Sequence, residues 1–338
     1  MKAALIGLGM VSKTYGDAFM NTDKVQLSHI LARSSASADE FRKNWPELDP
    51  IIAENVEEIA ASDVDFVIIT TPPNVRGSLI DPLTAAGKPI LLEKPVERNL
   101  HAATELVELC EARKMPLGIV LQHRFRPIVA DMHRVAASLG RLHAVECHVP
   151  WWRPQAYYNE LGRGTYARDG GGVMISQAIH IMDLMLSLTG PVAEVTAMTA
   201  TTGLHAMESE DFVSAGLRFE NGAVGNLFAT TSSFPGLGEF ITLHYNTGSV
   251  RLERGALRVD RHDGTTEEIG QVTGSGSGAD PMAFSSDAHR FVIEDFAEAL
   301  RNRRPPKVTG RDAIGVHRLI AALEKSGETG SKIAVKDI

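Results

Sequence analysis

Cysteines, aromatic residues and long apolar runs are all scarce in this chain of 338 residues. The two cysteines, Cys110 and Cys147, are too few and too far apart for a disulfide framework or a zinc site. The most apolar helix-like stretch, at 173–188, is short for a membrane span and is interrupted by His180 and Asp183. These absences exclude a disulfide-rich secreted domain, and we expect a cytoplasmic protein with no metal site and no membrane partner.

Positive charge is also in short supply, since 34 lysines and arginines face 42 aspartates and glutamates, a net charge of -8. An acidic chain of this kind is not expected to bind nucleic acid or an anionic membrane. Apolar residues at 43% and charged residues at 22% are typical of a folded protein and exclude a disordered one. Because 338 residues exceed what one hydrophobic core usually organises, we expect two domains. Met1 leads directly into an apolar segment without a signal-peptide pattern, which also favours the cytoplasm.

The first third of the chain alternates short apolar runs with amphipathic segments. Strands are expected at 3–6, 25–31, 65–70, 89–92 and 117–121, and helices at 11–20, 38–45, 75–86 and 100–113. Strands that alternate with helices at this spacing predict right-handed crossovers and a doubly wound parallel sheet. We therefore assign 1–122 to an α/β domain of the Rossmann type and 123–338 to a second domain.

The second part of the chain has a different pattern. Alternating apolar and polar residues between 192 and 259 are typical of antiparallel strands with one face in water. The second domain is therefore predicted to be α+β, with a large, mostly antiparallel, open-faced sheet. Its other expected elements are helices near 128–138, 173–188, 285–303 and 311–326, a strand near 142–149, an aromatic loop at 151–172 and a flexible loop at 273–280.

A glycine-rich turn directly follows the first predicted strand, where residues 7–12 read Gly-Leu-Gly-Met-Val-Ser. Glycines permit a tight turn, and the N–H groups where a helix begins can hold a pyrophosphate. Ser12 replaces the third glycine of the usual fingerprint, so an ordinary strand-to-helix turn is the alternative interpretation. We expect a dinucleotide to bind through the residues Gly7, Gly9, Met10 and Val11.

The end of the second predicted strand bears on cofactor choice. Folds that prefer NAD usually carry an acidic residue there, which accepts hydrogen bonds from the ribose hydroxyls. Here Ala32 takes that place and is followed by Arg33 and Ser34, a cation and a hydroxyl that suit a 2′-phosphate. We therefore expect NADP or NAD as the cofactor, with NADP slightly preferred. The alternative is that Arg33 is an ordinary solvated side chain.

Two further motifs follow later predicted strands: residues 70–74 read Thr-Thr-Pro-Pro-Asn, and residues 92–95 read Leu-Glu-Lys-Pro. Open α/β sheets bind ligands at these carboxyl ends of their strands. An ammonium at Lys94 would hydrogen-bond a reacting hydroxyl and stabilise alkoxide character, although most lysines are solvated surface residues. The expected cofactor contacts at these strand ends are Thr71, Pro72, Pro73, Asn74, Glu93 and Lys94.

A glycine triplet at 170–172 opens the predicted helix that carries His180. Ser176, His180 and Asp183 form a polar stripe beside the apolar face of this helix. A polar row on an otherwise apolar helix needs partners or a function. The alternative is a histidine satisfied within the core, but the glycines would let a ligand or another segment approach the helix start.

Together these motifs resemble the Gfo/Idh/MocA oxidoreductases, named for glucose-fructose oxidoreductase, inositol dehydrogenase and a rhizopine-catabolism protein. The resemblance extends over essentially the whole chain, and its most specific part is Glu93-Lys94-Pro95 before a Gly-Gly-Gly helix with His180. It implies that 1–122 binds NAD(P) and that 123–338 binds substrate and forms oligomers. It also implies a nicotinamide near Lys94, a sugar or polyol against the His180 helix, and a cis Lys94–Pro95 peptide.

Two positions depart from the family pattern. Inositol dehydrogenase-like members carry an Asp four residues before the histidine, whereas this chain has Ser176 followed by Gln177, so a catalytic Asp–His pair is not carried over. The Ser-Gln form looks more like the nucleotide-sugar 3-dehydrogenase branch, which has Asn-Gln there. The histidine often found after the Thr-Pro motif is Arg76 here, and we assign that position no role.

The loop at 151–172 holds five of the chain's Trp and Tyr side chains. Aromatic faces pack against sugar C–H surfaces, and arginines fork onto carboxylates or phosphates. The alternative is that these aromatics only hold a long loop or an oligomer interface together. The expected substrate contacts are Arg124, Trp152, Arg153, Tyr158, Arg163, Arg168, Gln177 and Asp183.

The resulting hypothesis is an NAD(P)-dependent sugar or polyol dehydrogenase, in which His180 accepts the proton of the substrate hydroxyl and Lys94 orients that hydroxyl. Asp183 or Ser176 would orient the imidazole. Two alternatives from the same family stay open, an NAD-dependent glycosidase and a non-catalytic, dinucleotide-binding regulator.

The predicted open-faced sheet also bears on assembly. Such a sheet must bury its second face or leave a large apolar patch. Apolar side chains along one strand, Phe212, Ala215, Leu217 and Phe219, therefore predict a homodimer or homotetramer formed through the sheet.

Overall fold

The computed structural model describes residues 1–272, 278 and 285–338, so the predicted loop at 273–280 lies, except for Gly278, outside the described residues. The chain forms two compact units, Met1–Gln122 with Ser285–Ile314, and His123–Phe284 with Gly315–Ile338. The change of pattern after residue 122 predicts that all of 123–338 forms the second domain, whereas helix α9 (Asp287–Asn302) belongs to the first unit. The reason is packing, because Phe296 of α9 meets Phe66 edge-on in the core of that unit, with ring centroids 5.3 Å apart.

The first unit is built on a six-stranded parallel sheet in the order β3-β2-β1-β4-β5-β6. All residues of β4, β5 and β6 are buried, as expected for strands covered on both faces. The predicted doubly wound Rossmann sheet is thereby confirmed. Its strands are β1 (Lys2–Ile6), β2 (Gln26–Leu31), β3 (Ile51–Ile52), β4 (Phe66–Ile69), β5 (Ile90–Glu93) and β6 (Leu117–Val120).

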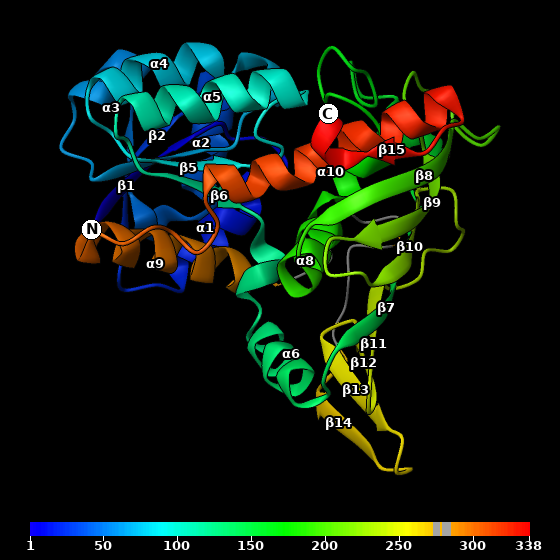
Figure 1. The fold of residues 1–338 in the computed structure, drawn as a ribbon. Coiled ribbons are helices and arrows are strands. Elements are labelled where there is room, and N and C mark those ends of the chain that lie inside the picture. The colour runs from blue at the N-terminus through cyan, green and yellow to red at the C-terminus, as the bar shows by residue number, and fades with distance from the viewer. Residues whose placement is uncertain (273–277, 279–284) are drawn as a thin grey trace. The chain divides into compact units, whose positions relative to one another are not determined.

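Helices cover both faces of this sheet, with α1 and α9 on one side and α4 and α5 on the other (Figure 1). Helices α2, α3 and α5 each begin after a Ser or Asn whose side chain accepts the N–H three residues further on. The helices before α9 are α1 (Ser12–Met20), α2 (Ser35–Asn44), α3 (Val56–Ala61), α4 (Gly77–Ala85) and α5 (Leu100–Ala112).

The second unit is built on a nine-stranded sheet in the order β14-β13-β12-β11-β7-β10-β9-β8-β15. Among the pairs, only β7 and β10 run parallel, so the predicted mostly antiparallel sheet is confirmed for the described part of the chain. Its strands are β7 (Leu142–Pro150), β8 (Val192–Ala200), β9 (Phe212–Phe219), β10 (Val224–Thr230), β11 (Phe240–Tyr245), β12 (Gly248–Glu253), β13 (Ala256–Arg261), β14 (Thr266–Gly270) and β15 (Ile333–Ala334).

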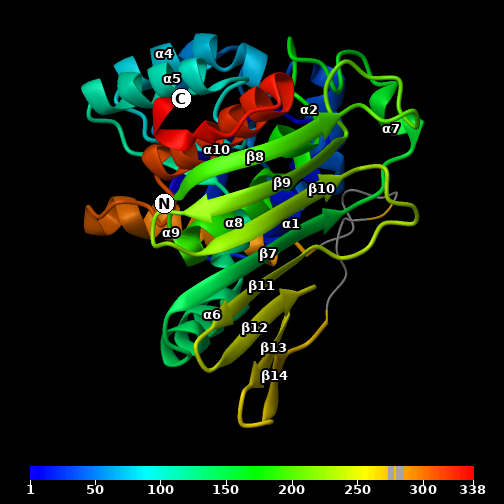
Figure 2. The ribbon, with the colours of Figure 1, turned by 45° about the vertical axis from the view of Figure 1, so that its right-hand side comes forward.

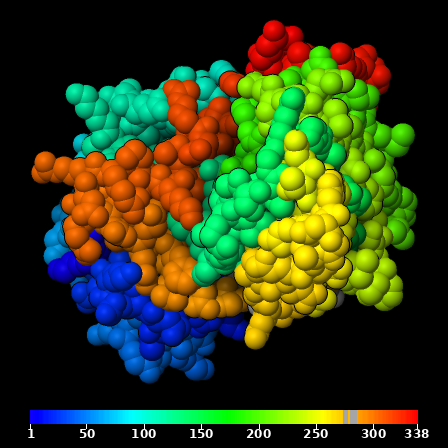
Figure 3. Space-filling model, turned by 60° about the horizontal axis from the view of Figure 1, so that its bottom comes forward, coloured from blue at the N-terminus to red at the C-terminus, as the bar shows by residue number. Residues whose placement is uncertain are grey.

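Helices α6 (Pro127–Ser138) and α8 (Ile179–Thr189) lie behind this sheet when its strands face the viewer in Figure 2. Helix α6 packs against β12, β13 and β14, and Figure 3 shows the yellow β13–β14 hairpin beside the green helix. A short helix, α7 (Gln155–Tyr158), lies in the aromatic loop, and α10 (Gly310–Thr329) begins in the first unit and ends in the second.

The helix predicted at 173–188 is not uniform. Residues Met174–Ala178 form a π-helical turn, and the α-helix α8 begins only at Ile179. π-turns inside helices are rare and often lie at functional sites. The wider turn ends at Ala178, and only Ile179 separates it from His180.

The four apolar residues that predicted a contact surface on β9 do not share one face of the sheet. Ala215, Leu217 and Phe219 are buried within the unit, while Phe212 points the opposite way along the alternating strand. That part of the prediction is wrong for the three buried residues, because their apolar alternation marks the covered face. A different row of side chains lies on the open face.

This row crosses four neighbouring strands. The ring of His148 on β7 lies 5.8 Å from Phe228 on β10 and stacks at 4.6 Å on Phe240 of β11. The guanidinium of Arg251 on β12 lies over Phe240, 3.6 Å from its centroid. We call Phe228, His148, Phe240 and Arg251 the aromatic row.

Within the described ranges, no helix is both long and apolar enough to cross a membrane. The same residues include no group of three or more His, Cys, Asp or Glu side chains that could hold a metal ion. Cys110 and Cys147 are both buried as free thiols.

Candidate functional site

The glycine turn connects β1 to α1 at the carboxyl end of the first strand. Gly7 has a φ of +99°, and a Cβ there would lie 3.0 Å from atoms of both Thr70 and Thr71. Its N–H donates to the carbonyl of Leu31, 2.9 Å away. A glycine is therefore favoured at position 7 for two reasons. Its φ is positive, and the segment that follows β4 leaves little room for a side chain.

Ser34, expected to donate to the cofactor, has a structural partner of its own. Its hydroxyl accepts the N–H of Ser37, 3.3 Å away, and so caps the start of α2. Arg33 beside it is exposed. Both residues predicted to contact a 2′-phosphate are therefore exposed, and Ser34 also caps α2.

The strand end that carries Lys94 rests on a buried carboxylate. Glu93 accepts a hydrogen bond from the hydroxyl of Tyr15 at 2.9 Å and from the N–H of Lys94 at 3.1 Å, and His289 lies 3.8 Å from it. Burial raises the pKa of Glu93. The Lys94–Pro95 peptide is cis, as the resemblance implied. The carboxylate of Glu93, predicted to touch the cofactor, is therefore engaged inside the protein.

A residue that sequence reasoning left without a role lies under the same loop. Arg76 is 1% exposed and is the largest fully buried side chain among those described. Its guanidinium donates to the backbone carbonyl of Thr71 and to that of Glu93, the residue before Lys94. In the sequence, the only sign that Arg76 has a special role is that it replaces a histidine often found at this position in the family.

The start of the His180 helix is held by a second residue that the sequence analysis missed. Glu210 accepts the N–H of Gly172 at 3.1 Å and of Met174 at 3.0 Å, while its own carbonyl accepts the N–H of Val173 at 2.8 Å. A Cβ at Gly172 would lie 1.7 Å from that carbonyl oxygen. The last glycine of the triplet is therefore explained by the approach of Glu210, and no ligand is needed to account for it. A carboxylate at a helix start also complements the helix dipole.

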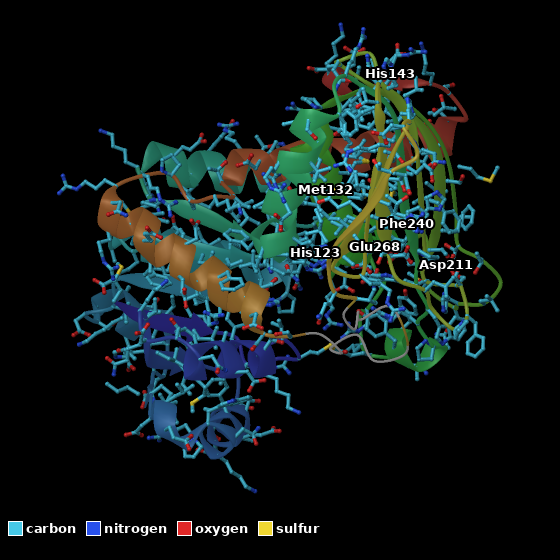
Figure 4. All side chains as sticks on the ribbon, turned by 90° about the horizontal axis from the view of Figure 1, so that it is seen from below. His123, Met132, His143, Asp211, Phe240 and Glu268 are labelled. Carbon is cyan, nitrogen blue, oxygen red and sulfur yellow. The ribbon has the colours of Figure 1, made fainter. Side chains whose placement is uncertain are left out.

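The next residue, Asp211, is connected to the aromatic loop through His205 and is labelled in Figure 4. It accepts hydrogen bonds from the N–H of Thr202 and the hydroxyl of Ser232, both at 2.7 Å. His205 lies 2.7 Å from Asp211 through one ring nitrogen and 2.8 Å from the carbonyl of Arg153 through the other. The Glu210–Asp211 dipeptide thus fixes both the helix start and the loop.

His180 lies on the first turn of α8 and is 8% exposed. Its ring stacks on His123, with centroids 5.1 Å apart (His123 is labelled in Figure 4). Asp183, expected to orient the imidazole or contact substrate, is fully buried and binds Arg124 through two hydrogen bonds of 2.7 and 2.5 Å. The predicted polar stripe therefore includes an internal ion pair.

Ser176 and Gln177 also have contacts within the second unit. The Ser176 hydroxyl donates to the carbonyl of Gly172 and lies against the side-chain oxygen of Gln177. The amide of Gln177 donates to the Tyr157 hydroxyl at 3.4 Å. The Ser-Gln pair thus connects the π-helical turn with the aromatic loop.

The arginines of the aromatic loop contact acids and rings of the loop itself. Arg163 and Arg168 both pair with Glu160, and Arg163 also stacks on Tyr157 at 4.2 Å. Arg153 is buried near the ring of Trp151. These contacts favour the alternative in which charged and aromatic side chains hold the loop together.

Two aromatic side chains of the loop have different surroundings. The hydroxyl of Tyr158 forms a buried hydrogen bond of 2.7 Å with Thr231. Trp152 is half-buried and meets Phe234 edge-on at 5.4 Å. Of the predicted aromatic contacts, Trp152 retains the greater accessible surface.

Comparison with known proteins matches both parts of the chain. A family model described as an oxidoreductase family with an NAD-binding Rossmann fold matches residues 1–120, and the GFO/IDH/MocA C-terminal domain matches residues 134–251. A D-apiose dehydrogenase of Paraburkholderia graminis is 23% identical over 100% of this chain and 90% of its own. An inositol 2-dehydrogenase of Rhizobium meliloti is 25% identical over 97% and 90%.

A solved structure extends the likeness to three dimensions. The WlbA dehydrogenase of Chromobacterium violaceum, in complex with NADH and UDP-GlcNAcA, is 25% identical and covers 99% of this chain and 95% of its own, with a TM-score of 0.82. Because the match covers 99% of this chain, the WlbA dehydrogenase is similar in fold to both units of this protein. With models of the same family matching the Rossmann sheet and the antiparallel sheet, the chain belongs to the Gfo/Idh/MocA oxidoreductases, whose Rossmann fold binds NAD.

Proposed function

We propose that this protein is an NAD(P)-dependent dehydrogenase or reductase of a sugar, sugar derivative or polyol, and that it works in the cytoplasm, where its two buried thiols stay reduced. The first unit binds the dinucleotide and the second binds the substrate. One observation carries this proposal: the Gly7 turn and Lys94 follow strands β1 and β5 at the carboxyl edge of one parallel sheet. Ligands of open α/β sheets bind at this edge.

The glycine turn fits a dinucleotide. A Cβ at Gly9 would meet no atom within 4 Å, so the backbone there is open to a ligand. The N–H groups of Met10 and Val11, where α1 begins, suit a pyrophosphate. When bound, the nicotinamide supplies the hydride acceptor or donor.

Lys94 and His180 carry out the proton chemistry. In the oxidative direction the carbinol C–H bond breaks, its electron pair leaves with the hydrogen as hydride, and the hydroxyl proton passes to the imidazole of His180. The ammonium of Lys94 donates a hydrogen bond to the same oxygen and stabilises its negative charge. The substrate becomes a carbonyl compound, and the reverse direction returns the same proton and hydride.

The internal ion pairs favour a neutral substrate. The guanidinium of Arg124 is held by Asp183, and those of Arg163 and Arg168 are held by Glu160. A carboxylate or phosphate on the substrate would have to displace these pairs, which costs more than binding to an open guanidinium. Neutral sugars and polyols are therefore the class we favour, as the names of the D-apiose and inositol relatives also suggest, whereas the WlbA neighbour was solved with the anionic UDP-GlcNAcA.

Alanine substitutions test the two proposed catalytic residues. Lys94→Ala and His180→Ala are each expected to lower kcat by about 10²–10⁴-fold, as positioned acid–base groups usually do. Exposed residues of the same types provide controls, Lys43→Ala and His262→Ala, which leave kcat unchanged. A residue whose variant keeps more than about a tenth of the wild-type kcat does not have the proposed role.

We further propose that the open face of the second unit binds a second copy of the chain, giving a homodimer or homotetramer. The aromatic row lies on this face, together with Met198, which is 66% exposed, and Val224, 46% exposed. Both charge signs occur along the row, as in the pair of Arg251 with Glu253 at 2.8 Å. A face with apolar and oppositely charged groups suits a two-fold contact with itself.

A further inference from the structure

The position of Arg76 in the first unit is unusual for a cation. It follows strand β4 and directly precedes α4, and its side chain turns inward until only 1% is exposed. Burial of a charge is costly unless hydrogen bonds replace the lost water. Burial lowers the pKa of Arg76 to about 10, and the charge of Glu93 partly offsets this shift.

The guanidinium is satisfied by backbone carbonyls from two loops. Nε and one terminal nitrogen donate to the carbonyl of Thr71, at 3.0 and 2.8 Å. The other terminal nitrogen donates to the carbonyl of Glu93 at 2.6 Å, of Pro95, and of Val96 at 3.3 Å. Among the described residues, all of its hydrogen bonds end on main-chain oxygens, which belong to the last residue of β5 and to the loops that follow β4 and β5.

These contacts restrain Lys94 on both sides. The carbonyls of the residues before and after it, Glu93 and Pro95, accept from the same nitrogen of Arg76. The N–H of Lys94 itself donates to the Glu93 carboxylate. The backbone at Lys94 and on both sides of it is therefore held by three hydrogen bonds.

The same guanidinium links this loop to the glycine turn. Thr71, whose carbonyl it holds, lies where a Cβ on Gly7 would come within 3.0 Å. Arg76 therefore fixes the relative placement of the Lys94 loop and of the segment that packs against the glycine turn. A planar guanidinium can donate to the Thr71 carbonyl and to the Glu93 carbonyl at the same time. A lysine ammonium at this site is a single point charge and would not reach both.

We propose that Arg76 is the positioning residue for Lys94, holding its ammonium in register with the nicotinamide end of the cofactor site. This inference rests on the proposed function, in which Lys94 hydrogen-bonds the reacting oxygen. A displacement of about 1 Å at such a group is enough to lower a rate about 10²-fold. Arg76 acts by positioning Lys94 and does not need to contact the substrate.

The test is a double-mutant cycle on kcat, measured in the full chain with its best substrate. Arg76→Lys keeps the charge but loses the fork, and Arg76→His keeps one donor in a smaller side chain. We expect either to lower kcat at least tenfold, with a change in the KM for cofactor of no more than about threefold. In a Lys94→Ala background the same substitution is expected to change kcat less than twofold, because the residue that it positions is gone.

Arg113→Met is the matched control, since this guanidinium also donates to a backbone carbonyl of the first unit, that of Asp81 at 2.7 Å. It is expected to leave kcat unchanged. An equal, additive loss in both backgrounds would overturn the positioning role, because a purely structural defect does not depend on Lys94. Failure of both Arg76 variants to fold would also overturn it, by making the residue a requirement of the fold. If Lys94→Ala alone retained full activity, the role of Lys94 and the positioning role of Arg76 would both fail, whereas a wild type that turned over no sugar or polyol would overturn the proposed function itself.

Discussion

Arg33 illustrates how a single exposed side chain could set cofactor choice. It follows Ala32 at the end of β2, where no carboxylate opposes a phosphate. A charge-assisted hydrogen bond of about 1.5–3 kcal/mol would favour NADP by roughly 10–150-fold, and screening at an exposed site reduces this toward tenfold.

Arg33→Ala is therefore expected to lower kcat/KM for NADP by roughly tenfold and to leave the value for NAD unchanged. Steady-state kinetics with both cofactors measure this. Arg42→Ala, another exposed arginine on the neighbouring helix, is the control and is expected to change neither value. A clear preference for NAD that Arg33→Ala does not alter would show that Arg33 is only a surface residue.

Single residues differ in how far the sequence could predict them. The positions of Gly7 and Lys94 directly after β1 and β5 were predictable, because each follows a short apolar run that forms a buried strand. The side-chain direction of Glu93 was not, because its buried partners Tyr15 and His289 are distant in sequence. The role of Arg76 was also not predictable, since its acceptors are main-chain carbonyls, which any residue type provides.

At the scale of elements, the helix that carries His180 depends on the strand that begins at Phe212. Glu210, just before that strand, holds the first turn of the helix through backbone and side chain together. The periodicity of 173–188 predicted a helix but could not show the π-helical turn, which changes the register by one residue without changing the apolar pattern.

Gly172→Ala is expected to destabilise the protein by about 2–4 kcal/mol or to prevent folding, because the new Cβ would lie 1.7 Å from the Glu210 carbonyl oxygen. Urea denaturation of the cofactor-free protein measures the effect. Gly9→Ala, whose Cβ meets no atom within 4 Å, is the control and is expected to unfold as the wild type does. Equal stability of Gly172→Ala and wild type would contradict the packing described here.

A second acidic residue near this helix start makes stability depend on pH. Burial, followed by the charges of Glu210 and Glu328, raises the pKa of Glu324 on α10 to about 8, from an ordinary value of 4.5. Because the folded protein favours the protonated form, this contribution to stability is full below about pH 4.5 and is lost as the pH rises through about 8.

Glu324→Gln cannot ionise and is expected to be more stable than wild type by about 1–2 kcal/mol near pH 9, with the two proteins similar near pH 5. Denaturation midpoints at both pH values measure this difference. The exposed Glu40→Gln is the control and is expected to follow the wild-type pH dependence. A parallel loss of stability in wild type and Glu324→Gln would show that another group is responsible.

At the scale of the whole molecule, sequence order and structural unit do not coincide. The alternation of strands and helices was enough to predict the parallel sheet, because each element follows its neighbour along the chain. It could not predict that α9 joins the first unit, since the contact of Phe296 with Phe66 links residues far apart in sequence. The covered face of β9 was misassigned for a related reason, because alternation shows that one face is apolar but not what covers it.

The aromatic row offers a direct test of assembly. Phe240→Glu places a charge between His148 and Arg251 and is expected to convert the proposed oligomer to a monomer, since burial of an extra carboxylate at an interface is costly. Light scattering at micromolar concentration measures the mass. Leu161→Glu, at a side chain that is 95% exposed on the aromatic loop, is the control and keeps the wild-type mass. A monomeric wild type would contradict the proposed interface.

We propose that this chain moves a hydride between a nicotinamide and a neutral sugar or polyol. The most direct measurement is the fluorescence of reduced cofactor when the purified protein, with NADP or NAD, is offered aldoses, polyols, sugar acids and nucleotide sugars in turn. We expect net, substrate-dependent cofactor reduction with at least one neutral sugar or polyol, exceeding that with the sugar acids, and we expect Lys94→Ala to lose it. Release of a free aglycone without net reduction, or cofactor binding without turnover across the whole panel, would contradict it.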